Sequence, residues 1–324
     1  MGLPARPAQL GRYDVIAKIA GGGLSTVYLG RRKDDGETVA LKIVRHDLRG
    51  DKDVLEMFTD EAKLLPRLEH PGIVKTLEVG IGSETAFIAM ELLLGVTLGQ
   101  VLRTCATKGF GLHPEACAFI IARVADALHY AHELGVIHRD ANPENVFLGF
   151  DGSVKLIDFG LAKAEGRLTQ SMPGVVKGKL PYLAPEQIMQ LPIDRRADVF
   201  TLATTFWEML TMRRLFRRDT DEETLRAVHC GPIVDPCRLA PDVPRELGEI
   251  ITRALERNRD QRTPTANILA VQLDAFLHRR GVSDARTAIA ATMGELFMFE
   301  AQRQRGWRRR ILSRSSRTRL ASAG

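Results

Sequence analysis

The strongest constraint on the fold is a change of hydrophobic pattern about a third of the way along the 324-residue chain. Before it, β-rich runs alternate with glycine turns, and after Pro114 the apolar residues recur with helical spacing. The predicted strands are 13–20, 26–32, 37–44, 74–79, 85–92, 146–148 and 154–157, and the predicted helices are 53–65, 115–134, 197–210, 221–229, 244–257 and 264–278. This order predicts an α+β protein with a small β-rich lobe, a larger helical lobe and a cleft between them.

The formal charge of +6 is concentrated at the C-terminal end of the chain. Residues 301–324 contain eight arginines, no lysine and no acidic residue. Without them, residues 1–300 carry 38 basic and 40 acidic side chains, a net charge of −2. A basic surface for nucleic acid or a membrane is therefore expected only of this tail.

The remaining composition argues against membrane insertion and secretion. No run of 18 uncharged apolar residues is present, and the first residues, MGLPARPAQLGRYD, lack the apolar stretch of a signal peptide. The four cysteines form no CxxC pair, which is typical of free thiols in a reducing compartment. We therefore expect a cytoplasmic protein without a transmembrane segment.

Two features of the β-rich third are candidate phosphate contacts. A glycine-rich segment, Ala20–Ser25, joins the first two predicted strands, and glycine lets backbone N–H groups approach phosphate oxygens closely. By itself, such a segment is more often an ordinary hairpin turn. Lys42 ends the apolar strand Val39–Lys42, where it either extends along a sheet edge or anchors a phosphate.

The most informative residues are two short motifs in the helical part. His138–Asn145 reads HRDANPEN, and Asp158-Phe159-Gly160 follows eighteen residues after Asp140. Two carboxylates and an amide on adjacent loops provide oxygen ligands for a hard cation and a base for a hydroxyl group.

With Ala184-Pro185-Glu186 downstream, the order, spacing and residue types of these motifs resemble those of the protein kinase family. The resemblance covers about residues 11–280. The runs GRYDVIAKIAGGG and KGKLPYLAPEQ look most like the bacterial eukaryotic-like (Hanks-type) serine/threonine kinases. The family resemblance implies the two-lobed protein-kinase fold, with an N-lobe at 11–92 and a C-lobe at 93–280. An N-terminal extension, 1–10, and a C-terminal tail, 281–324, flank this domain.

The resemblance implies ATP and Mg²⁺ (or Mn²⁺) as cofactors and assigns a role to each motif residue. Lys42 would hold the α- and β-phosphates and pair with Glu61. Asp140 would accept the proton of the substrate hydroxyl, and Asn145 and Asp158 would bind the metal ion. For adenine, Met90 would be the gatekeeper and the backbone of Glu91 and Leu93 would donate and accept hydrogen bonds. The other implied nucleotide contacts are Ala20, Gly21, Gly22, Gly23, Leu24, Ser25, Val27, Ala40 and Phe147.

Three further implications concern the scaffold and its regulation. Glu186 would form a buried ion pair with Arg262. Asp198 would hold the backbone of His138 and Arg139. Self-phosphorylation is expected at Thr169 or Ser171, although unmodified loop hydroxyls are an equally good interpretation of both residues.

Several positions depart from the kinase pattern. Ala20 and Ser25 replace two glycines of the loop, Asn142 replaces the lysine near the γ-phosphate, and Lys179 replaces a threonine of the activation segment. We hypothesise that Lys179 supplies the positive charge that Asn142 lacks. The alternative is two independent losses in a weakened enzyme.

The favoured function is ATP-dependent phosphorylation of protein serine or threonine residues in signal transduction. A pseudokinase, acting as a nucleotide-sensing scaffold with weak or no phosphotransfer, is the main alternative. A small-molecule kinase is disfavoured by Ala184-Pro185-Glu186, which in this family builds a platform for protein substrates.

The C-terminal region has its own pattern. Residues 284–299 predict an amphipathic helix that docks on the domain or on a partner. The arginine-rich residues 303–319 fit an acidic partner, an anionic membrane surface or nucleic acid, and equally a solvated terminus. The serines and threonine beside these arginines are further candidates for self-phosphorylation.

Overall fold

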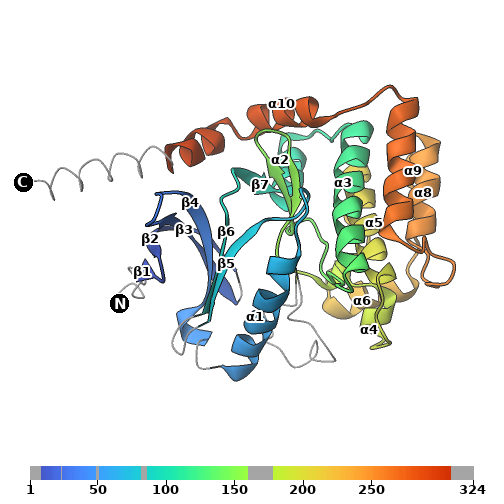
Figure 1. The fold of residues 1–324 in the computed structure, drawn as a ribbon. Helices are drawn as coiled ribbons and strands as arrows, with labels where there is room; N and C mark the ends of the chain where they lie inside the picture. The colour runs from blue at the N-terminus through green and yellow to red at the C-terminus, as the bar shows by residue number, and fades with distance from the viewer. Residues whose placement is uncertain (1–8, 23, 49–50, 82–85, 160–177, 308–324) are drawn as a thin grey trace, which may run out of the picture. The chain divides into compact units, whose positions relative to one another are not determined.

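The computed structural model of the protein describes residues 9–22, 24–48, 51–81, 86–159 and 178–307 (Figure 1). The chain divides into two compact units. Unit 1 comprises residues 1–69, 74–95 and 297–324, and unit 2 comprises residues 70–73 and 96–296. In the part of the chain that is described, no helix is both long and apolar enough to cross a lipid bilayer.

Unit 1 is built on a six-stranded antiparallel sheet of strand order β1-β2-β3-β4-β6-β5. One face of the sheet forms a hydrophobic core around Tyr13, Leu41 and Phe87, whose rings and branched side chains are almost entirely buried. The strands are β1 (Gln9–Leu10), β2 (Tyr13–Gly21), β3 (Ser25–Arg32), β4 (Thr38–Val44), β5 (Thr76–Ile81) and β6 (Ala86–Glu91). Helix α1 (Lys52–Leu64) and residues 298–307, which are helical, complete the unit.

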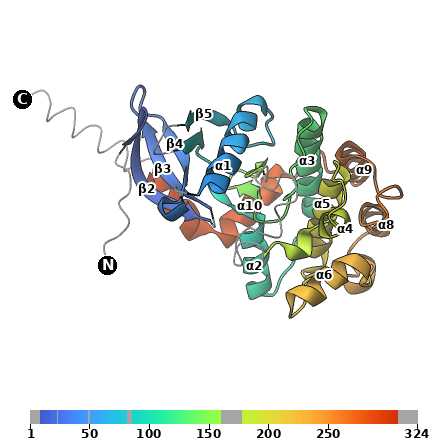
Figure 2. The same ribbon diagram turned by 90° about the horizontal axis from the view of Figure 1, so that it is seen from below.

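Unit 2 is mainly helical and is centred on α5 (Arg196–Thr211), all but one of whose residues are buried. The long helix α3 (Pro114–Glu133) lies beside α9 (Ala266–Arg279), as Figures 1 and 2 both show. The other helices are α2 (Leu98–Lys108), α4 (Pro185–Ile188), α6 (Asp221–Cys230), α7 (Pro236–Leu239), α8 (Arg245–Ala254) and α10 (Arg286–Leu296). A small sheet of order β7-β8-β9 joins them, made of β7 (Gly95–Thr97), β8 (Val146–Gly149) and β9 (Val154–Leu156).

All of the predicted strands and helices are found, and the differences lie at their ends and in short elements. The main omission is α2, which begins with a capping box in which the Thr97 hydroxyl accepts from Gln100 N. The Thr-x-x-Gln sequence is a recognised start signal for a helix. The helix predicted at 284–299 is instead two helical segments. Helix α10 ends at Leu296, Phe297 is not helical, and residues 298–307 form the second segment.

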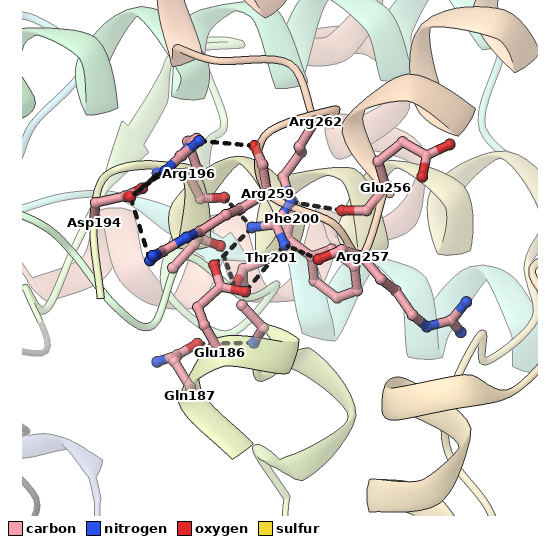
Figure 3. A network of polar contacts seen from close by, with 12 residues as sticks. Glu186, Gln187, Asp194, Arg196, Phe200, Thr201, Glu256, Arg257, Arg259 and Arg262 are labelled. Carbon is pink, nitrogen blue, oxygen red and sulfur yellow. Dashed lines mark hydrogen bonds and ion pairs between the residues drawn. The ribbon is translucent and has the colours of Figure 1, made fainter. Parts of the chain in front are cut away.

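A buried ion pair ties α4 to the loop before α9 (Figure 3). Arg262 donates to both carboxylate oxygens of Glu186, at 2.7 and 3.0 Å, and both side chains are at least 96% buried. The same guanidinium donates to the carbonyl oxygens of Arg196, Glu256 and Arg257. This predicted pair is confirmed, and it anchors the chain shortly after Lys179.

We expect Glu186→Gln to lower the free energy of unfolding by about 3 kcal/mol, because it leaves the Arg262 charge buried without a counter-charge. Chemical denaturation measures the change. Glu222→Gln is the control, since Glu222 pairs with Arg226 in solvent, at 2.9 Å, and exposed pairs contribute about 0–1 kcal/mol. Equal effects of the two substitutions would contradict the importance of the buried pair.

Candidate active site

In unit 1, strand register gathers several predicted nucleotide contacts on one face of the sheet. Val27 is paired with Lys42, and Ala40 with Met90, so these four alternate with the core residues of the opposite face. Lys42 is only 7% exposed, which is unusual for a lysine and indicates that its ammonium group is held by neighbours. Its predicted partner Glu61 lies in α1, but the Glu61 side chain is outside the described residues.

The glycine-rich segment forms the hairpin between β2 and β3. Gly22 N donates to Ser25 O at 2.9 Å, and Ala20 is paired with Val27. Gly23 is outside the described residues, and Leu24 is half-buried. The hairpin interpretation is therefore confirmed, whereas the phosphate-loop role remains a prediction from the sequence.

The end of β6 and the residues that follow it carry the predicted adenine contacts. Glu91 N donates to Lys75 O at 3.0 Å, and the Glu91 carboxylate accepts from Lys75 N at 2.8 Å. Because the Glu91 N–H already donates to Lys75, a backbone hydrogen bond between Glu91 and adenine has to be one that the Glu91 carbonyl oxygen accepts. Leu93 is half-buried, two residues further along.

In unit 2, a buried carboxylate on α5 accepts hydrogen bonds from the backbone of the predicted catalytic motif. Asp198 Oδ2 accepts from His138 N at 2.8 Å, and Oδ1 accepts from Arg139 N at 2.7 Å. The Asp198 side chain is fully buried, and so is that of His132 on α3, whose Nε2 lies 2.7 Å from Asp198 Oδ2. The backbone of Arg139 adopts the left-handed conformation (φ 64°), which is energetically unfavourable for a residue other than glycine. The hydrogen bond to Asp198 stabilises this conformation. The predicted role of Asp198 is confirmed.

His132 is a residue to which the sequence alone assigned no function. The only available signal was its position on the helix immediately before the catalytic motif. The sequence likewise predicts no separate role for the His138 ring. In the structure, this ring packs on Phe159, with the ring centroids 4.6 Å apart. Burial lowers the pKa of His138, which favours the neutral ring in the folded protein.

Asp140 is surrounded by donors that orient its carboxylate. Oδ1 accepts from Asn142 Nδ2 at 2.7 Å, while Oδ2 accepts from Asn145 Nδ2 at 3.1 Å and also from Lys179 Nζ. Asp140 is 5% exposed, and the Lys179 side chain is 36% exposed. The structure thus brings together three of the residues predicted for catalysis, Asp140, Asn142 and Lys179.

Asn142 is used entirely within its own loop. Its Nδ2 donates to Asp140, its Oδ1 accepts from Glu144 N at 2.9 Å, and it is 2% exposed. Both polar ends of the carboxamide therefore have partners inside the loop. Asn142 stiffens the loop around Asp140 and does not extend outward as a lysine side chain would.

The predicted metal ligands lie at neighbouring ends of a hairpin. Asn145 immediately precedes β8, Asp158 follows β9, and Ile157 N donates to Asn145 O at 2.8 Å. Asn145 Nδ2 is held by Asp140, so the amide oxygen is the atom left for a cation, and Asp158 adds a half-buried carboxylate. An amide oxygen and a carboxylate suit Mg²⁺. No cluster of three His, Cys, Asp or Glu side chains suited to a metal occurs among the described residues.

The remaining predicted residues are placed less informatively. Phe147 lies on β8, half-buried and paired with Lys155. Thr169, Ser171, Gly160 and the tail beyond Trp307 are outside the described residues.

Asp198→Asn tests whether the Asp198 carboxylate holds the backbone of the predicted catalytic motif. An amide offers one acceptor oxygen where two backbone N–H groups and His132 now share a carboxylate, so we expect a loss of about 3 kcal/mol in unfolding free energy. Denaturation with urea measures it. Asp126→Asn, on the exposed side of α3, is the control, and equal stability of the two variants would contradict the role given to Asp198.

Comparison with known proteins identifies this arrangement. The family model described as "Protein kinase domain" matches residues 13–273. The chain is 38% identical over 278 residues to Tyrosine-protein kinase MasK of Myxococcus xanthus, covering 82% of this chain and 43% of that protein. It is 32% identical over 275 residues to Serine/threonine-protein kinase PknL of Mycobacterium tuberculosis, covering 85% and 68% of the two chains.

Solved structures agree with the sequence relatives. The crystal structure of the Mycobacterium tuberculosis PknI kinase domain matches with a TM-score of 0.65 and 25% identity, covering 85% of this chain and 99% of that one. This match confirms the predicted protein-kinase fold, with its β-rich sheet and its helical part. A pseudokinase is not favoured by these relatives, which are named as kinases. PknL, and also PrkC of Bacillus subtilis, are named serine/threonine kinases, the group that the motifs indicated. The chain belongs to the protein kinase family.

Proposed function

We propose that the protein transfers the γ-phosphate of ATP to a serine or threonine hydroxyl of protein substrates. The observation that carries this proposal is the Asp140 carboxylate, buried in the catalytic loop and oriented by donors from Asn142, Asn145 and Lys179. Phosphoryl transfer requires positioning and charge stabilisation more than covalent chemistry, and a fixed carboxylate beside metal-binding oxygens meets that requirement.

The proposed division of labour follows the two units. In unit 1, Lys42 binds the phosphates and Val27, Ala40, Met90 and the backbone of Glu91 and Leu93 bind adenine. In unit 2, Asn145 and Asp158 hold Mg²⁺, which when bound neutralises charge on the phosphates. Asp140 accepts the proton of the attacking hydroxyl, and its oriented oxygen aligns that hydroxyl with the phosphorus.

We further propose that Lys179 provides the positive charge that the catalytic loop lacks at Asn142. Three contacts support this: Lys179 Nζ donates to the Asp140 carboxylate, Asn142 Nδ2 donates to Asp140, and Asn142 Oδ1 accepts from Glu144 N. A cation bonded to the proposed base is close to the reacting groups, so it can stabilise the negative charge that develops on the transferring phosphoryl group. Self-phosphorylation at Thr169 or Ser171, and binding of the arginine-rich tail to an acidic partner or an anionic surface, remain proposals from the sequence.

The class of hydroxyl rests on the relatives and on the motif. PknL and PrkC are named serine/threonine kinases, whereas MasK is named a tyrosine kinase. Pro143 and the length of the catalytic motif favour serine and threonine. Phosphoamino-acid analysis of the labelled product distinguishes the two classes.

Asp140→Asn tests the proposed activity. The amide preserves the size of the side chain but cannot accept a proton from the substrate, so transfer of labelled phosphate from ATP to the protein itself or to a basic protein is expected to fall about 100-fold or more. Retained binding of Mg-ADP by the variant shows that the fold is intact. Equal labelling by the wild type and the variant would contradict the assignment of Asp140.

Lys179→Met tests the compensation. It keeps the aliphatic stem and removes the charge, and we expect kcat to fall about 10-fold or more with little change in the KM for ATP. Lys179→Arg, which restores a cation, is expected to recover part of the rate. Lys108→Met, on the exposed end of α2, is the control. An unchanged kcat for Lys179→Met would mean that Asn142 and Lys179 are independent departures.

A further inference from the structure

The helical residues 298–307 carry one buried face that contains a polar side chain. Ala301 and Gln304 are three residues apart, so they lie on the same face of the helix, and they are 8% and 6% exposed. Phe297, immediately before the helix, is half-buried. On the other faces, Phe299 is 80% exposed and Gln302 and Arg305 are exposed. A buried glutamine on an otherwise apolar contact face needs hydrogen-bond partners.

Gln304 finds both of its partners in a single residue. Its Oε1 accepts from Gly95 N at 2.9 Å, and its Nε2 donates to Gly95 O at 2.9 Å. The carboxamide thus pairs with one backbone residue as a neighbouring β-strand would, across 209 residues of sequence. Glutamine has a donor and an acceptor side by side, whereas glutamate has acceptors alone and leucine has neither.

Gly95 lies at the end of the segment that carries the adenine contacts. At the start of this segment, Glu91 exchanges two hydrogen bonds with Lys75, and at its end Gly95 exchanges two with Gln304. All of these residues belong to unit 1. The backbone between Glu91 and Gly95 is therefore held at both ends, by the sheet on one side and by the C-terminal helix on the other.

We propose that Gln304 is a positioning residue for nucleotide binding, which sets the backbone of residues 91–95 in the geometry that adenine requires. The inference rests on the proposed function, in which Glu91 and Leu93 bind adenine. A segment that is already ordered loses less conformational freedom when a ligand binds, so its affinity is higher. The C-terminal helix is then part of the nucleotide-binding unit and not an appendage to it.

This role predicts a specific kinetic pattern. Gln304 lies in unit 1, whereas Asp140, Asn145 and Lys179 lie in unit 2. Loss of Gln304 should therefore raise the KM for ATP and weaken the binding of ADP, while kcat at saturating ATP stays close to that of the wild type. A purely structural role would lower the melting temperature and the active fraction without changing nucleotide affinity.

The test uses the full chain and three variants. Gln304→Glu keeps the shape but sets a carboxylate oxygen against the Gly95 carbonyl, and Gln304→Leu leaves both Gly95 groups without a side-chain partner. Gln302→Glu makes the same change of charge at an exposed position of the same helix. Isothermal titration calorimetry with Mg-ADP measures affinity without any need for catalysis. Titration of ATP in the presence of a protein that accepts the phosphate measures KM and kcat.

We expect both Gln304 variants to bind Mg-ADP about 10-fold more weakly than the wild type and Gln302→Glu to bind it normally. Melting temperatures with and without Mg-ADP show which variants are folded. Folded Gln304 variants with wild-type ADP affinity would overturn the inference. If the wild type binds ADP but phosphorylates nothing, the proposed function fails while the calorimetric comparison still decides the role of Gln304.

Discussion

The geometry of the candidate active-site residues in unit 2 depends on one buried carboxylate, that of Asp198. It sits on α5, a helix with almost no exposed residue, and it accepts hydrogen bonds from the backbone of His138 and Arg139 and lies within hydrogen-bonding distance of His132. A buried charge is tolerated only when donors surround it, so the catalytic loop and α5 stabilise one another. Because the donors of the loop are the backbone N–H groups of His138 and Arg139, this contact does not depend on the side chains of the loop.

That arrangement explains how the motif can vary at Asn142. Asp198 holds the backbone of the loop, so the side chain at position 142 is not needed for that purpose. The Asn142 carboxamide instead donates to Asp140 and accepts from Glu144 N. In the proposed mechanism, Lys179, from a different part of the chain, carries the charge that the loop lacks at this position. Charge stabilisation depends on where a cation lies and not on which segment carries it, so the proposed exchange is physically consistent with phosphoryl transfer.

The sequence predicted the main strands and helices because their apolar spacing is regular, and it predicted the Glu186–Arg262 and Asp198 contacts through the family resemblance. It did not predict α2, although Thr97 and Gln100 form a capping box, nor the break at Phe297. It also assigned no role to His132 or Gln304. Neither residue belongs to a motif, and each makes its buried contact with a partner 66 or 209 residues away.

The amino-acid sequence by itself determined the family, the order of secondary structure and the identity of the chemical groups, since these depend on local spacing and residue type. Only the tertiary structure decided that Asn142 faces inward, that Lys179 contacts Asp140, and that Gln304 pairs with Gly95. Such contacts join residues far apart in the chain, and their formation depends on packing, because a buried polar group must find its partner wherever the fold places it.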